Sequence, residues 1–140
     1  AADCEHETDF LRAQAAEAGF IAGVVGWVPL MDPDATARAI EKRRANGAPL
    51  VGVRHLIHDE PDPDWVVRPE VLRSLGLLAE AGLAFDLSAF QPRHLEHVTA
   101  IAEAAPELDL VVCHFGMPPA DPAAQAPWAR AFARAAEHAR

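Results

Sequence analysis

The stretch Leu110-Val111-Val112-Cys113-His114-Phe115-Gly116-Met117-Pro118 decides the fold class of this chain. An apolar run typical of a buried strand ends on a histidine, and glycine and proline break the chain directly afterwards. The pattern places an imidazole at the carboxyl end of a strand, where parallel α/β proteins carry their functional residues. Two upstream stretches are built alike, since 50–55 ends on two basic residues and 83–86 ends on a carboxylate. Three such strands suggest part of a barrel with a site at one rim.

Helical and strand-like patterns alternate along the whole chain. The strands are continuously apolar, which is typical of a parallel sheet in an α/β protein. Four strands do not close a (β/α)8 TIM-type barrel, which takes about 250 residues. Residues 1–140 are therefore expected to form a single domain, either a small open sheet or a partial barrel with about four parallel strands and five helices. We expect strands at 21–28, 50–56, 83–87 and 108–114, helices at 7–18, 33–45, 69–81 and 127–139, and a further helix that Pro92 opens.

Composition excludes several classes of protein. Half of the 140 residues are apolar, so the chain is not disordered, and no apolar run approaches the roughly 20 residues that a membrane span needs. The net charge is -9 and the basic residues are scattered, so we expect neither a nucleic-acid nor a membrane partner. Two cysteines without the spacing of a metal site, Cys4 and Cys113, favour a reducing, cytoplasmic environment.

Four stretches, in this order, point to a family: 23–28 (GVVGWV), 50–57 (LVGVRHLI), 82–87 (GLAFDL) and 114–118 (HFGMP). They resemble the amidohydrolase-related metal-dependent hydrolases, and within them the branch of sugar lactonases and 2-pyrone-dicarboxylate lactonases. The resemblance implies a (β/α)8 barrel whose first strand ends in His-x-His and whose last strand ends in a catalytic Asp. Neither feature occurs in this sequence, so the resemblance implies an internal fragment that is inactive alone.

The activity that the resemblance implies is hydrolysis of a lactone, or of a related cyclic ester or carbonyl substrate, by the parent enzyme. Water attacks the carbonyl of a small-molecule substrate, and a divalent metal, with zinc favoured, or basic side chains stabilise the oxyanion. Some relatives need no metal, and homo-oligomerisation stays open. Pro29 and Met117 stand where the family often has Asp and Lys, which leaves the substrate open. The alternatives are a decarboxylase of the same superfamily and a non-catalytic α/β domain that binds a ligand.

Four residues are candidates for the site. His114, the candidate catalytic residue, would ligate a metal or polarise a substrate carbonyl; the alternative is a histidine satisfied by backbone in a turn. Arg54 offers a planar fork for a substrate carboxylate or lactone oxygen, or pairs with Asp86. Asp86 would orient Arg54 or bind a metal or a substrate hydroxyl; the alternative is a helix cap or a salt bridge. Trp27 would form a wall of the substrate pocket, or serve only in packing. His55 should point away from Arg54, because successive strand residues face opposite sides.

Other polar residues are expected to have structural roles. His94 and His97 lie three residues apart on a predicted helix and are expected at its surface. His58 begins an acidic, proline-rich segment, 58–64, that is expected to be a solvated loop. Cys113 should face away from His114 and pack in the core.

Overall fold

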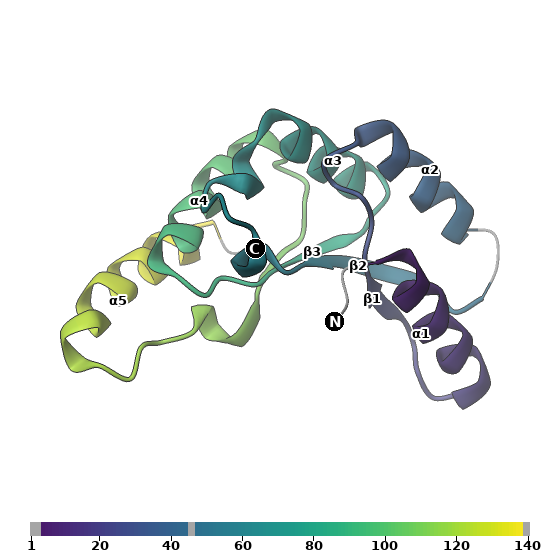
Figure 1. The fold of residues 1–140 in the computed structure, drawn as a ribbon, viewed down its shortest axis with the longest axis horizontal. Helices are drawn as coiled ribbons and strands as arrows, with labels where there is room; N and C mark the ends of the chain where they lie inside the picture. Colours follow the sequence, from purple (N-terminus) through teal and green to yellow (C-terminus); the bar gives the residue numbers. More distant parts are fainter. Residues whose placement is uncertain (1–3, 45–46, 139–140) are drawn as a thin grey trace.

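Parallel strands and helices alternate along the chain in the computed structural model, which describes residues 4–44 and 47–138. Figure 1 shows helices α2, α3 and α4 along one face of the sheet, with α1 beside β1 and α5 beside α4. Three short 3₁₀ turns, η1, η2 and η3, follow strands β2 and β4. The elements are α1 (Glu5–Ala18), β1 (Val24–Gly26), α2 (Pro33–Arg44), β2 (Leu50–His55), η1 (Ile57–Asp59), η2 (Trp65–Val67), α3 (Pro69–Glu80), β3 (Ala84–Leu87), α4 (Pro92–Ala104), β4 (Leu110–Val112), η3 (Cys113–Gly116) and α5 (Pro122–Ala136).

The four strands form one parallel sheet in the order β1-β2-β3-β4, so that each strand pairs with the next one in the chain. Sequential parallel strands with a helix in every connection are the arrangement of a (β/α)8 barrel, of which this chain builds a part. All four strands therefore end at the same rim of the sheet. The predicted fold class is confirmed.

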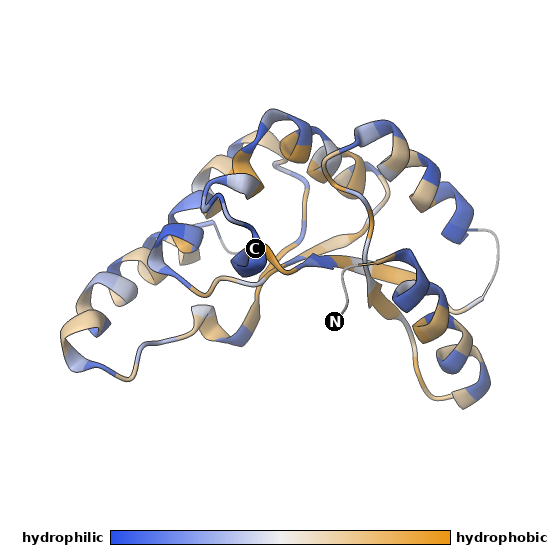
Figure 2. Ribbon diagram, in the orientation of Figure 1, coloured by the Kyte–Doolittle hydropathy of each residue, from blue (hydrophilic) through white to orange (hydrophobic). Residues whose placement is uncertain are grey.

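The hydrophobic core lies between the sheet and the helices. Val53, Phe85 and Leu87 are fully buried on the face of the sheet that packs against the apolar side of α3, including Leu75 and Leu78. In Figure 2 the hydrophobic residues of the helices along this face gather on the side toward the sheet, and hydrophilic residues cover the outer side. The opposite face of the sheet carries Arg54 and Asp86 among half-exposed valines, and we call it the open face.

Several predicted boundaries are wrong, and the last strand, predicted at 108–114, is confined to Leu110–Val112. The first strand is confined to Val24–Gly26, and Ile21 is exposed before it. The last helix begins at Pro122 rather than near Pro127, because the Asp121 side chain accepts a hydrogen bond from the Ala123 amide and caps the helix there. Residues 45 and 139, the predicted ends of two helices, lie outside the described residues. No helix in the described part of the chain is long and apolar enough to cross a membrane.

Candidate active site

Arg54, Asp86 and Cys113 come together on the open face. Arg54 and Asp86 are register partners of β2 and β3, so both side chains emerge on the same side of the sheet. The Cys113 thiol, just beyond the end of β4, lies beside both of them, and their charges act on its pKa in opposite directions. The prediction that Cys113 packs in the core is wrong, because β4 alternation places it on the open face with Asp86.

The electrostatics of this group favour a neutral thiol beside a carboxylate and a guanidinium. Burial raises the pKa of Asp86, while the charge of Arg54 and the hydrogen bond from Cys113 act in the opposite direction. Burial, and then the charge of Asp86, raise the pKa of the Cys113 thiol. Cys113 is therefore mainly a protonated thiol at neutral pH. Within this group, the guanidinium of Arg54 is the side chain that can donate hydrogen bonds to an anionic or carbonyl oxygen of a substrate.

His55 faces the helices, as strand alternation predicts, and it connects three segments at the rim. The indole Nε1 of Trp27 donates to Nδ1 of His55 over 3.0 Å, and Nε2 of His55 lies 2.7 Å from Oε1 of Glu60. Because an indole only donates, Nδ1 carries no proton and Nε2 donates to the carboxylate. The imidazole also stacks on Trp65, with 4.1 Å between ring centroids. Trp27 thus fastens the end of β1 to β2, and its role as a pocket wall stays a prediction.

His114 is exposed at the end of β4, where the sequence predicts it. The chain turns sharply here, and the turn's hydrogen bond runs from the Met117 amide to the His114 carbonyl over 3.0 Å. The hydrogen bond that closes this turn is therefore accepted by the backbone carbonyl of His114 and does not involve the imidazole. The imidazole lies nearly perpendicular to the ring of Phe90, which also stacks on His58 with 3.9 Å between ring centroids. Its place at the rim fits the predicted role, which stays a prediction.

The prediction that His94 and His97 lie on the surface is wrong. Their exposed fractions are 1% and 5%, because the segment after β2 folds over α4. Nε2 of His97 lies 2.9 Å from Oδ1 of Asp64, and Nε of Arg93 donates to the same oxygen over 2.8 Å. Burial lowers the pKa of His94, and the neighbouring His97 and His58 act in the same direction. The acidic segment 58–64 is thus bound to α4 through Asp64, and the prediction of a solvated loop does not describe it.

The described residues do not fit a metal ion by themselves. Among residues 4–44 and 47–138, no three His, Cys, Asp or Glu side chains are grouped so that they could hold one. Asp86 lies beside the cation of Arg54, and Cys113 keeps its proton, whereas metal ligands must be deprotonated. His114 is exposed and supplies at most one donor here.

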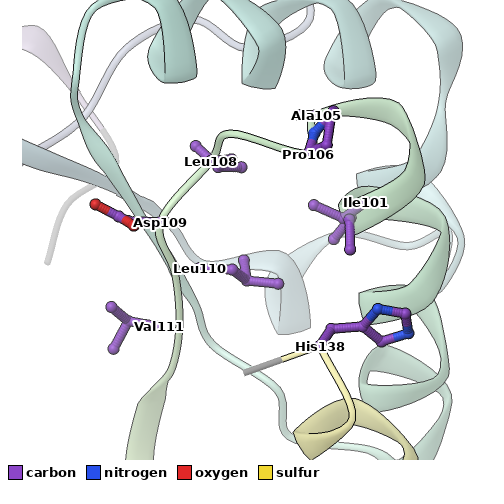
Figure 3. Close-up of a pocket in the computed structure, with 9 residues that line it drawn as sticks. Ile101, Ala105, Pro106, Leu108, Asp109, Leu110, Val111 and His138 are labelled. Carbon is purple, nitrogen blue, oxygen red and sulfur yellow. The ribbon is translucent and has the colours of Figure 1, made fainter. Parts of the chain in front are cut away.

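The hollow drawn in Figure 3 is separate from these residues. Its volume is about 250 Å³, and it lies between the carboxyl end of α4, the segment that leads into β4, and His138 after α5. His114 and Cys113 lie at the other end of β4. The hollow is therefore not part of the candidate site.

The sequence over residues 1–140 matches the amidohydrolase family, and the chain belongs to that family. It is 31% identical over 134 residues to L-fucono-1,5-lactonase of Burkholderia ambifaria, a match that covers 96% of this chain and 45% of the relative. Two crystal structures show an amidohydrolase from Burkholderia multivorans, one with bound zinc and one with bound HEPES. Their sequences are 31% and 30% identical to this chain. Each superposes with a TM-score of 0.82 over 96% of this chain and 47% of the other. The chain therefore spans just under half the length of these relatives.

Proposed function

We propose that this chain is part of a hydrolase that opens the ring of a sugar lactone. The observation that carries the proposal is the placement of Arg54 and His114 at the same rim, at the ends of β2 and β4. Parallel α/β folds bind substrates outside the carboxyl ends of their strands. The relative from Burkholderia ambifaria, which acts on L-fucono-1,5-lactone by its name, supports the substrate class.

In the proposed reaction, water adds to the ring carbonyl, the bond between the carbonyl carbon and the ring oxygen breaks, and a proton passes to that oxygen. The product is an open-chain hydroxy acid. Arg54 donates from its planar fork to the carbonyl oxygen, where negative charge develops, and later to the product carboxylate. Asp86 and Cys113 lie beside the guanidinium on the open face and interact with its charge. His114 hydrogen-bonds and polarises the same carbonyl. The base for the attacking water is not assigned among the described residues.

We also propose a divalent metal ion, with zinc as the first candidate. His114 would be one of its ligands, and the other ligands would come from outside the described residues. The zinc in the structure from Burkholderia multivorans supports that choice. No step above passes through it, because the described residues do not form such a site. We also propose a cytoplasmic location, which the two free cysteines, Cys4 and Cys113, support.

The experiment is a lactonase assay on the complete protein that contains this chain, with acid release from L-fucono-1,5-lactone and other sugar lactones followed by a pH indicator. We expect hydrolysis well above the uncatalysed rate. The change His114→Ala should lower kcat/KM by about 10²–10⁴, and Arg54→Met by about 10²–10³. The matched controls are His6→Ala and Arg38→Met, two exposed positions on α1 and α2 that should keep wild-type rates. A complete protein that accelerates no lactone overturns the proposal, and a His114→Ala variant within twofold of wild type removes His114 from it.

A further inference from the structure

The turn that carries His114 has an unfavourable backbone. Four successive residues, His114, Phe115, Gly116 and Met117, have φ angles of 51°, 57°, 65° and 48°, and only one of them is a glycine. We call residues 114–117 the His114 turn. The left-handed region is disfavoured for residues with a side chain, because Cβ approaches the following carbonyl oxygen. Such a backbone persists only where surrounding contacts impose it, and it occurs preferentially at functional sites.

The contacts that impose this backbone come from α5. The indole Nε1 of Trp128 donates to the Gly116 carbonyl over 2.8 Å. Phe132, one helical turn further along, stacks on Phe115 with 4.5 Å between ring centroids, and Trp128 stacks on Phe132. On the other side, a Cβ at Gly116 would lie 2.9 Å from a methyl carbon of Leu95 in α4, so Gly116 is packed between two helices.

Helix α5 itself is held firmly against α4. Ala131 and Ala135 are buried in the core cluster, and Nε2 of His138 lies 3.0 Å from Oγ1 of Thr99 in α4. Trp128 therefore reaches the turn from a fixed support and not from a free end of the chain. The contacts of Trp128 and Phe132 fall within the turn, at Gly116 and Phe115, which are two residues and one residue after His114.

We propose that Trp128 is a positioning residue for His114, which it places through the backbone of the turn. The hydrogen bond to Gly116 and the aromatic stack keep the turn left-handed, and this backbone directs the imidazole to the rim of the sheet. The inference rests on the proposed function where it concerns lactone hydrolysis. The geometry of the turn itself is independent of that function.

The test is Trp128→Phe in the complete protein, since this change keeps an aromatic ring in the stack and removes the indole donor. We expect kcat for the lactone to fall by about tenfold to a hundredfold, as for a misplacement of roughly 1 Å, with a much smaller change in KM. The imidazole NMR signals of His114, assigned with a His114→Asn variant, should move from their wild-type positions. Arg130→Ala, a change at an exposed position of α5, is the matched control and should change neither readout.

A second change separates positioning from general damage to the fold. Glycine adopts positive φ at little cost, so Met117→Gly should make the left-handed turn less dependent on Trp128. We expect the double variant Trp128→Phe/Met117→Gly to regain much of the lost kcat and wild-type His114 signals. The proposal is overturned if Trp128→Phe leaves the His114 signals unmoved, or if the double variant regains nothing. The NMR readout needs no substrate, so failure of the lactonase proposal leaves this test decisive.

Discussion

Replacing Phe85 with alanine tests whether the core lies on the helix side of the sheet. Phe85 sits in the central strand β3 with an exposed fraction of 0%, among the apolar side chains of α3 and α4. A buried phenylalanine removes about 200 Å² from water, which at about 25 cal/mol per Å² is worth about 5 kcal/mol. The alanine methyl group retains about 1 kcal/mol of this. The free energy of unfolding should therefore fall by about 4 kcal/mol, within the range of 3–5 kcal/mol for such changes.

The assay is equilibrium unfolding in urea, followed by circular dichroism and tryptophan fluorescence. The matched control is Phe20→Ala, the same change at a side chain that is 86% exposed after α1. This control should alter the free energy of unfolding by no more than about 0.5 kcal/mol. Comparable losses for the two variants, or a loss below about 1 kcal/mol for Phe85→Ala, would refute the assignment of the buried face.

Three further changes have expected outcomes in the same unfolding assay. Asp86→Asn should gain stability relative to wild type as the pH rises through about 3.8: burial raises the folded-state pKa of this carboxyl, so wild-type stability is greatest below the unfolded value and falls above it. A difference between the two proteins that stays constant with pH would contradict this. Ser74→Ala should cost about 1–3 kcal/mol, since the buried Ser74 hydroxyl donates to the Leu30 carbonyl over 2.7 Å; an unchanged midpoint would show that the hydrogen bond is absent in solution. Asp121→Ala should cost about 0.5–2 kcal/mol through loss of the α5 cap, and Asp121→Asn should retain most of it.

The strands are the part of the fold that the sequence predicts best. Continuous apolar runs locate all four strands along the chain, and three of the runs end in the polar residues Arg54, Asp86 and His114, which lie at the carboxyl ends of their strands. The start of α5 is less predictable. Pro127 suggests a first helical turn, but Asp121 and Pro122 provide a complete helix start five residues earlier, and the helix continues through Pro127.

The misjudged site residues depend on contacts between segments that are distant in the sequence. His97 is buried because Asp64 and Pro63, more than 30 residues earlier, fold onto α4. A helical wheel describes one helix and carries no information about such a loop. Alternation counted from His114 predicts that Cys113 faces the core, but the left-handed backbone that starts at His114 ends the alternation of the strand. Alternation counted from β3 through its partner residues in β4 places Cys113 on the side of Asp86.

The central claim is that a lactone and its sugar-acid product bind over the open face, beside Arg54, Asp86 and Cys113. The most direct measurement is the rate at which Cys113 reacts with N-ethylmaleimide in a Cys4→Ser variant of the complete protein, with and without the sugar-acid product. The account predicts that the product slows this reaction severalfold and does not slow the reaction of Cys4 in a Cys113→Ser variant. Equal rates for Cys113 with and without the product, at concentrations that inhibit hydrolysis, would contradict it.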